Sequence, residues 1–175
     1  APMGMDKLLE SVSAVSIAVP TQFHFDIAKR CLENGVAPLI EKPVVGDPEK
    51  GKQLQRLAEM VGLPVQVGHV ERFNPAVQVV NDIVEDLNVL AVDAKRLGQP
   101  PNRQIDDSAV IDLMIHDLDI VLSLVDDETE SVMSAGVRSN RYGTATIDFE
   151  SDTVATLTAS RLTQRKVRKL EITAE

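Results

Sequence analysis

Three short apolar runs alternate with two amphipathic helical patterns over residues 12–67, and this alternation restricts the fold more than any other feature. The first run, residues 12–19, consists of small and β-branched residues, and the runs at 36–40 and 63–67 are similarly apolar. Strands that are buried on both faces have this composition. The order strand–helix–strand–helix–strand therefore predicts a parallel sheet with right-handed crossovers.

Capping residues mark the ends of the two helices between these runs. Thr21 can cap the first helix, and Gly35 can end it. Asp47 followed by Pro48 predicts the start of the second helix, and Gly62 its end. The apolar stripe expected on the first helix consists of Phe23, Ile27, Cys31 and Leu32.

The pattern changes in the second half of the chain. The expected helices and strands there are a helix at 75–87, a strand at 89–97, a helix at 108–125 and strands at 130–138, 144–150, 153–160 and 166–173. Short polar turns separate these last strands, which is typical of an antiparallel or mixed sheet. We therefore predict an α/β chain. Residues 1–72 form part of a Rossmann-type parallel sheet, and residues 73–175 form an α+β domain with a mostly antiparallel open sheet.

Composition narrows the class of protein. The formal net charge of −9 disfavours nucleic acid as a partner, because nucleic-acid binders usually carry a basic surface. No apolar run reaches the length of roughly 18–20 residues that a membrane helix needs. The single cysteine, Cys31, cannot form an internal disulfide, so we interpret it as a core thiol in a cytoplasmic protein.

Glu41-Lys42-Pro43 is the first candidate for chemistry, because it follows the second predicted strand directly. Open α/β sheets bind their ligands at the carboxyl ends of their strands. A lysine at that edge can lose hydration, lower its pKa and hold or move a proton on a substrate oxygen. The alternative is a surface Glu-Lys pair at the end of a strand.

Asp112, His116 and Asp119 are the second candidate, because their i, i+4, i+7 spacing puts them on one face of the predicted helix. An aspartate one turn from a histidine can fix the ring's tautomer and stabilise its protonated form. The alternatives are a solvated polar stripe and a metal pair. The metal pair lacks an obvious third ligand, because His24 and His69 lie in other contexts.

Three further segments carry polar groups. Residues 21–24 follow the first predicted strand and residues 68–75 follow the third, so both can reach the same sheet edge. A polar connecting loop explains residues 68–75 equally well. A basic cluster near the C-terminus is either a solvated edge strand or a group that faces an anionic substrate. Its members are Arg161, Arg165, Lys166, Arg168 and Lys169.

Four motifs together resemble one family. They are Ala-Val-Pro-Thr-x-x-His at 18–24, Glu-Lys-Pro at 41–43, Gly-His-x-x-Arg-Phe-Asn-Pro at 68–75 and Asp-x-x-x-His-Asp-x-Asp at 112–119. Their order and spacing are similar to those of the Gfo/Idh/MocA oxidoreductases, which are NAD(P)-dependent sugar and polyol dehydrogenases. In detail the chain resembles the bacterial UDP-N-acetylglucosamine 3-dehydrogenase branch, in part through Ser-Arg-Leu-Thr-x-x-Lys-Val-Arg at 160–168.

The resemblance implies a role for each matching residue. Lys42 would be the catalytic lysine, His116 the base and Asp112 the group that orients it. The cofactor side would be lined by Pro20, Thr21, His24, Glu41, Lys42 and Pro43. The substrate side would include Arg72, Phe73, Asn74, Arg96 and Arg103. No metal is implied.

The resemblance also sets expectations for the whole protein. The cofactor is NAD or NADP, and the substrate is a sugar or a nucleotide sugar such as UDP-N-acetylglucosamine. We expect a homo-oligomer that forms through the C-terminal sheet. The alternatives are a dehydrogenase of a free sugar or inositol, and a non-catalytic member that senses a dinucleotide.

One departure from the family pattern concerns the cofactor. The sequence contains no G-x-G-x-x-G motif, which in this family belongs to a strand, turn and helix ahead of the first predicted strand. We therefore expect a fragment without the N-terminal strands. Such a chain should bind NAD poorly and show little or no activity by itself.

Overall fold

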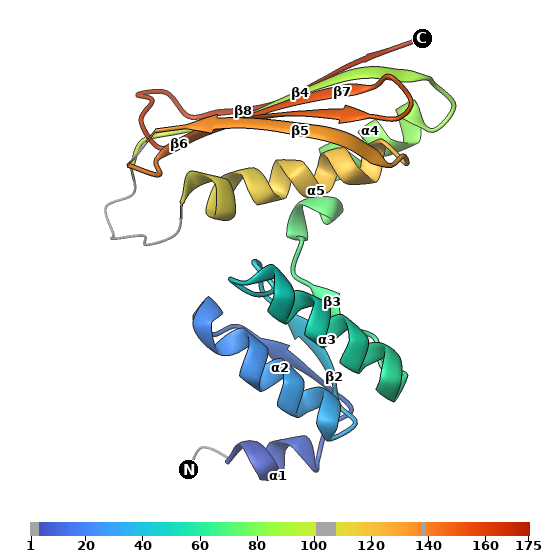
Figure 1. Cartoon of the computed structure of the whole chain (residues 1–175), viewed down its shortest axis with the longest axis vertical. Helices are drawn as coiled ribbons and strands as arrows, with labels where there is room; N and C mark the ends of the chain where they lie inside the picture. Colours follow the sequence, from blue (N-terminus) through green and yellow to red (C-terminus); the bar gives the residue numbers. More distant parts are fainter. Residues whose placement is uncertain (1–3, 101–107, 138) are drawn as a thin grey trace. The chain divides into compact units, whose positions relative to one another are not determined.

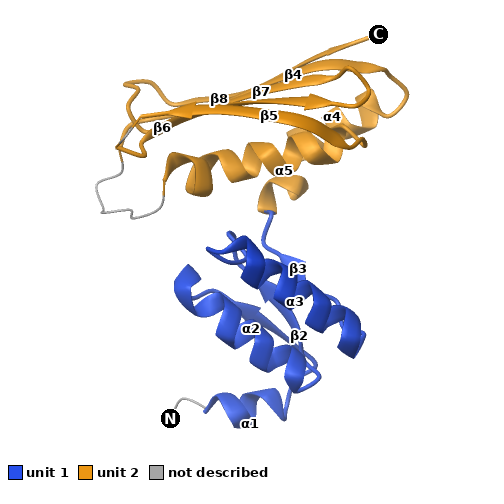
Figure 2. Ribbon diagram, viewed as in Figure 1, with its two compact units in different colours: residues 1–69 blue, residues 70–175 orange. Residues whose placement is uncertain are grey.

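The computed structural model describes residues 4–100, 108–137 and 139–175. The chain divides into two compact units, a first unit of residues 1–69 and a second unit of residues 70–175 (Figure 2). The sequence placed the domain boundary between residues 72 and 73. Each unit has its own apolar core and is described by itself.

The first unit is a parallel sheet with helices, as the alternating pattern predicts (Figure 1). Its elements are α1 Met5–Leu9, β1 Ala14–Ile17, η1 Thr21–Phe23, α2 His24–Glu33, β2 Ala37–Ile40, α3 Pro48–Val61 and β3 Gln66–Val67. The strand order is β1-β2-β3, and both pairings are parallel. Helix α1 was not predicted from the sequence.

The core of the first unit lies where the strands meet α2 and α3. Ile17 of β1, Ile40 of β2 and Leu54 of α3 are buried there. Cys31 is also buried, which confirms its interpretation as a core thiol. Burying an aliphatic side chain of this size contributes about 1.5–3 kcal/mol.

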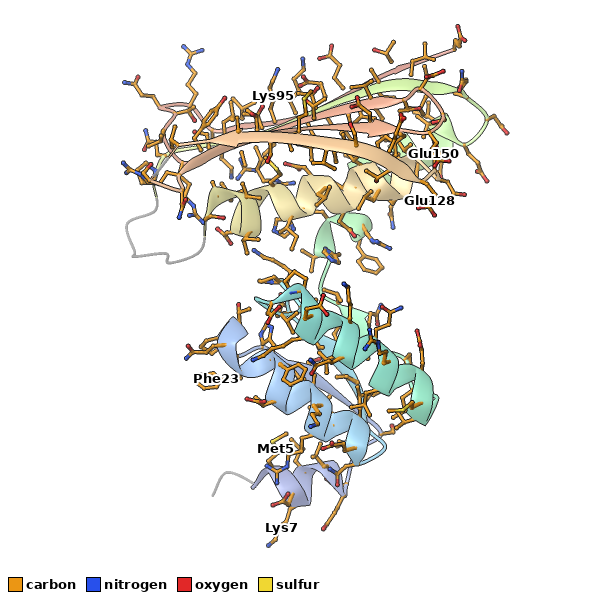
Figure 3. The ribbon with its side chains drawn as sticks, viewed as in Figure 1. Met5, Lys7, Phe23, Lys95, Glu128 and Glu150 are labelled. Carbon is orange, nitrogen blue, oxygen red and sulfur yellow. The ribbon has the colours of Figure 1, made fainter. Side chains whose placement is uncertain are left out.

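Helix caps in the first unit agree with the sequence for α3 and for the end of α2, where Gly35 has φ +74°, and differ at the start of α2. The Asp47 carboxylate accepts a hydrogen bond from the Glu49 amide at 3.0 Å, and Gly62 ends α3 in the left-handed conformation with φ +67°. The prediction that Thr21 caps the next helix is wrong, because Thr21 begins the short helix η1 instead. Phe23 is also not a core residue, because 48% of its surface is exposed (Figure 3).

The second unit combines helices with a five-stranded sheet. Its elements are η2 Val70–Phe73, α4 Pro75–Val84, β4 Val89–Leu97, η3 Val110–Met114, α5 Ile115–Leu124, β5 Thr129–Gly136, β6 Tyr142–Phe149, β7 Val154–Ser160 and β8 Val167–Ala174. The strand order is β5-β6-β7-β4-β8. Only β4 and β7 pair in parallel, so the expected mostly antiparallel sheet is confirmed.

Helix α5 runs along one face of this sheet (Figure 1). The core between them includes Val92 of β4, Phe149 of β6, Leu157 of β7 and Val121 of α5. Side chains alternate along each strand, so the neighbours of these core residues lie on the opposite face. Lys95, three positions after Val92 in β4, lies on this opposite face (Figure 3).

The long helix predicted at residues 108–125 begins with a π-helical segment, η3, and continues as α5. The Ser108 hydroxyl accepts a hydrogen bond from the Ile111 amide at 3.1 Å and so acts as the expected cap. Single π-helical turns are rare and occur frequently at functional sites. Among the described residues, no helix is both long and apolar enough to cross a membrane.

Candidate active site

Three loops of the first unit begin at the carboxyl ends of its strands. Pro20 and Thr21 follow β1, Glu41-Lys42-Pro43 follows β2, and Gly68 follows β3. Backbone hydrogen bonds continue the sheet into two of these loops, from the Glu41 amide to the Ile17 carbonyl at 3.0 Å and from the Gly68 amide to the Ile40 carbonyl at 2.7 Å. The sheet edge that the sequence predicted as a ligand site therefore carries the Lys42 motif.

His24 connects two of these loops from inside the first unit. Its side chain is 1% exposed, with Nδ1 2.9 Å from the Pro43 carbonyl and Nε2 2.8 Å from the Val19 carbonyl. These contacts tie the end of β1 to the residue that follows Lys42, and the Lys42–Pro43 peptide bond is cis. His24 thus holds the backbone of the candidate cofactor loop.

Gly68 allows the backbone after β3 to approach the Glu41 side chain. A Cβ atom at Gly68 would lie 3.1 Å from a Glu41 carboxylate oxygen, which is closer than ordinary van der Waals contact. A side chain at this position would therefore displace the carboxylate. The close approach agrees with the role that the sequence analysis gave to this glycine.

In the second unit, the candidate orienting residue Asp112 is bound to an arginine. Arg161, at the end of β7, donates a hydrogen bond from Nη2 to the Asp112 carboxylate at 2.5 Å and is only 6% exposed. The sequence analysis had placed Arg161 in the basic cluster near the C-terminus. The structure instead places its guanidinium beside the motif helix.

Arg96 lies at the centre of a second ion cluster. It is 8% exposed, and it donates to the Asp117 carboxylate at 2.6 and 3.0 Å and to the Glu71 carboxylate at 2.9 Å. Burial alone would lower the pKa of Arg96, but the hydrogen bonds and charges of these carboxylates outweigh it and raise the pKa. Arg96 therefore stabilises the buried end of the cluster.

Glu71 connects this cluster to the residues around His116. A hydrogen bond from Asn74 is the main cause that lowers the pKa of Glu71, and burial opposes it. Arg96 and the charge of His116 lower the pKa further. The carboxylate of Glu71 is therefore ionised at neutral pH, and it belongs to the electrostatic environment of His116.

A third arginine binds the last acidic residue of the motif. Arg72 donates from Nε and Nη2 to the two oxygens of Asp119 at 2.7 and 2.6 Å, which is a bidentate pair. Hydrogen bonds and the charge of Asp119 raise the pKa of Arg72 against partial burial. Three arginines from different elements thus bind Asp112, Asp117 and Asp119 on either side of His116.

The remaining predicted site residues differ in their surroundings. Phe73 is 69% exposed, so its ring is accessible. The Asn74 side chain caps α4 by accepting from the Ala76 amide at 3.1 Å. Arg103 lies outside the described residues.

The sequence analysis missed Glu71, Asp117 and Arg161 as parts of the site. Asp117 lies inside the recognised motif, but its partner Arg96 is 21 positions away, and Arg161 is 49 positions from Asp112. No local spacing rule links such pairs. Among the described residues, no group of three or more metal-ligating side chains is close enough together to hold a metal ion.

Comparison with known proteins identifies the family. Residues 3–69 match an oxidoreductase family with an NAD-binding Rossmann fold, and residues 91–175 match the GFO/IDH/MocA C-terminal domain. The chain belongs to the Gfo/Idh/MocA family. The resemblance that the four motifs indicated is thereby confirmed.

Curated relatives of this family cover most of the chain. UDP-N-acetylglucosamine 3-dehydrogenase of Acidithiobacillus ferrooxidans is 36% identical over 172 residues, or 96% of this chain and 55% of the relative. Inositol 2-dehydrogenase of Rhizobium meliloti is 28% identical over 85% of this chain and 48% of the relative. The chain thus spans about half the length of these two relatives.

Solved structures agree with this assignment. A structure of the Acidithiobacillus ferrooxidans enzyme superposes with a TM-score of 0.90 at 35% identity, over 97% of this chain and 57% of that chain. A scyllo-inositol dehydrogenase from Lactobacillus casei superposes with a TM-score of 0.81 at 22% identity, over 95% of this chain and 55% of that chain. The second similarity concerns the fold alone.

Proposed function

We propose that this chain belongs to an NAD(P)-dependent dehydrogenase that oxidises a hydroxyl group of a nucleotide sugar such as UDP-N-acetylglucosamine. The observation that supports this most strongly is the arginine-bound motif helix that carries His116 in a Gfo/Idh/MocA chain. The similarity to the Acidithiobacillus ferrooxidans dehydrogenase supports the nucleotide-sugar class. The first unit would take the cofactor and the second the substrate.

The reaction converts a secondary alcohol into a ketone. The C–H bond breaks with both electrons, the O–H bond gives up its proton, and a C=O double bond forms. NAD(P), when bound, supplies the nicotinamide ring that accepts the hydride. The protein must then bind the hydroxyl oxygen and remove its proton.

Lys42 is proposed to donate a hydrogen bond to the reacting oxygen. An ammonium group there favours the alkoxide that develops as the proton leaves. His24 supports this role because it fixes the backbone of Pro43 next to the lysine. Such a backbone anchor reduces the freedom of the loop before the substrate arrives.

His116 is proposed to accept the proton, because the unperturbed imidazole titrates near neutral pH. Asp112 would orient the helix turn around His116 while bound to Arg161. The nearby carboxylate of Glu71 favours the imidazolium that forms when the proton arrives. Arg72, Phe73 and Asn74 would shape the substrate side.

The described residues fit one part of a dinucleotide cofactor. The strand ends of the first unit present Pro20, Thr21, Glu41 and Lys42 at one edge, and the close approach of Gly68 keeps side-chain bulk away from Glu41. The sequence has no glycine-rich motif for a pyrophosphate. We therefore propose that these 175 residues alone bind NAD or NADP weakly.

A homo-oligomer is proposed through the five-stranded sheet. Its face opposite α5 carries half-buried threonines at 144, 146, 156 and 158, and no described helix covers it (Figure 1). A flat face of this kind can pair with a second copy of itself.

A second candidate function is the oxidation of inositol or a free sugar. It is favoured by the similarity to several inositol dehydrogenases, which are 27–38% identical over 43–86% of the chain. A non-catalytic sensor is less well supported, because it would not need Lys42, Asp112 and His116 together.

The test uses a chimera in which these 175 residues replace the matching segment of the Acidithiobacillus ferrooxidans enzyme. Reduction of NAD(P) is followed with UDP-N-acetylglucosamine, N-acetylglucosamine and myo-inositol as substrates. We expect turnover with the nucleotide sugar and its loss in Lys42→Ala. A chimera that prefers myo-inositol, or a Lys42→Ala variant that retains turnover, would contradict the proposal.

A further inference from the structure

Two arginines stand directly opposite each other on neighbouring strands of the second unit. The antiparallel register of β4 and β8 pairs Arg96 with Arg168. Like charges in opposite positions of a sheet destabilise the pairing. The Arg96–Arg168 pair is therefore expected to lower the stability of the sheet, and a function of one of the two arginines could explain why the pair is present.

The two arginines differ in their partners. Arg96 is neutralised by Asp117 and Glu71. Arg168 donates from Nη1 to the Leu97 carbonyl at 3.0 Å and to the Val167 carbonyl at 2.9 Å, and no carboxylate of the described residues forms an ion pair with it. Desolvation first, and then the charge of Arg96, lower the pKa of Arg168, and the charges of Asp117 and Glu71 oppose this shift only in part.

Arg168 borders a hollow beside the start of α4, which we call the Arg168 hollow. Its lining includes Arg96, Lys166, Arg168 and Lys169 from the sheet side, and the cap and first turn of α4 from the other; Lys169 pairs with Glu171. The carboxylates of Glu71 and Asp117 also line it, but Arg96 binds both of them. Lys166 and Arg168 are therefore the cations that remain for a ligand.

The direction of α4 adds to this positive character. The ten-residue helix α4 begins at Pro75, so its amino end lies at the hollow. The amino end of a helix carries a partial positive charge that favours anions; because Asn74 already accepts from the first amides of α4, the helix contributes this charge without a free amide. The planar fork of an arginine matches two phosphate oxygens at once.

We infer that the Arg168 hollow binds the diphosphate of the sugar nucleotide, with Arg168 and Lys166 as its cationic contacts. This inference rests on the proposed function and deepens it, because it assigns the anionic part of the substrate to a place in the second unit. An anion between Arg96 and Arg168 also offsets the repulsion across the β4–β8 pair. The bound ligand would thus stabilise the pairing of β4 and β8, which the repulsion between Arg96 and Arg168 weakens in the free protein.

The competing explanation is that Arg168 protects an edge strand. Strand β8 is at one edge of the sheet, and charged residues on such strands prevent association. Lys169 and Glu171 of β8 already form an ion pair in solvent. An edge charge of this kind needs no partner and would not affect ligand binding.

The experiment titrates the 175-residue chain by calorimetry with UDP, inorganic pyrophosphate, uridine and NAD. The variants are Arg168→Met, Arg168→Lys and the matched control Arg141→Met. Arg141 is also exposed, but it precedes β6, and two strands separate β6 from β8. Thermal unfolding of every variant is measured in parallel.

We expect UDP and pyrophosphate to bind, and uridine to bind more weakly than UDP. Arg168→Met should weaken UDP binding by about tenfold or more, as expected for one charged hydrogen-bonded contact. Arg168→Lys should lose less affinity, and Arg141→Met should bind as the wild type does. The melting temperature of Arg168→Met should change little, because the repulsion from Arg96 that is removed offsets the two hydrogen bonds to backbone carbonyls that are lost.

Unchanged UDP affinity in both Arg168 variants would overturn the inference and favour the edge-strand explanation. Competition by NAD that depends on Arg168 would overturn the assignment to a sugar nucleotide and give the site to a dinucleotide. If UDP binds through Arg168 but the chimera oxidises only inositol, the result would support the diphosphate site and contradict the proposed substrate. If the chimera oxidises UDP-N-acetylglucosamine equally well with Arg168→Met, the result would support the proposed function and contradict the assignment of the diphosphate to the Arg168 hollow.

Discussion

The two units hold their candidate catalytic groups by different means. In the first unit, the loop that carries Lys42 is fixed through its backbone, with His24 in contact with the carbonyl groups of Val19 and Pro43. In the second unit, the helix that carries His116 is fixed through side chains, because its aspartates bind three arginines, from η2, from β4 and from the position after β7. The first arrangement depends on burial of one ring, and the second on a network of charges.

This difference predicts different sensitivities. A backbone anchor inside an apolar core depends little on salt, whereas salt screens ion pairs that reach the solvent. Removal of one member of a buried ion cluster leaves an uncompensated charge. The second unit should therefore be more sensitive than the first to single changes of charge.

Each unit contains its own spectroscopic or chemical reporter. Tyr142 of β6 is the only tyrosine, and the chain has no tryptophan, so tyrosine fluorescence follows the second unit. Cys31 is the only cysteine and is buried in α2, where burial raises the pKa of its thiol. Because the thiolate is the reactive form, Cys31 should react with thiol reagents only when the first unit opens.

Arg96→Met should have the largest effect. It leaves the buried Asp117 carboxylate without its partner, and we expect the second unit to lose about 3–5 kcal/mol of unfolding free energy. Urea unfolding followed by Tyr142 fluorescence measures this loss. Arg141→Met is the control and should stay within about 0.5 kcal/mol of the wild type. A loss below about 1 kcal/mol for Arg96→Met would contradict the view that a network of charges holds the motif helix of the second unit.

His24→Leu should have the next largest effect, and in the first unit. The change removes the ring nitrogens that lie within 2.9 Å of two carbonyl oxygens, so at least one carbonyl loses its donor, which costs about 1–3 kcal/mol. Reaction of Cys31 in increasing urea should shift to lower concentrations, while the Tyr142 transition stays in place. Phe23→Leu, a change at an exposed neighbour, is the control. An equal shift of both reporters would show that the units do not unfold separately.

Asp119→Asn should have a smaller effect. Its partner Arg72 has a side chain that is 54% exposed, and solvent screening limits the value of such a pair to about 0.2–1 kcal/mol. The Tyr142 transition in urea should therefore move much less than in Arg96→Met. A loss as large as that of Arg96→Met would mean that the two ion pairs form one cooperative network.

Glu71→Gln should give the smallest effect, and one that depends on pH. The folded protein lowers the pKa of Glu71, so its carboxylate stabilises the fold above its ordinary pKa of about 4.3. That contribution is lost as pH falls through the lower folded pKa. The difference in melting temperature between wild type and Glu71→Gln should therefore be greatest near neutral pH and shrink below about pH 4. A difference that does not change with pH would argue against this ionised role.

The sequence predicted the first unit better than the second, for a physical reason. Strand ends, capping residues such as Asp47 and Gly62, and the Lys42 motif are local patterns, and the structure confirms the caps and the sheet. In the second unit the sheet type and the motif helix were predicted. The π-helical start at Val110 and the pairs of Arg161 and Arg96 were not, because they depend on contacts between distant residues.

We propose that the second unit recognises a sugar nucleotide and that the first unit, within these 175 residues, binds a dinucleotide weakly. The most direct measurement is a calorimetric titration of the 175-residue chain with UDP-N-acetylglucosamine and, separately, with NAD. We predict saturable binding of UDP-N-acetylglucosamine and weaker binding of NAD. Tighter binding of NAD than of the sugar nucleotide, or no binding of UDP-N-acetylglucosamine, would contradict the account.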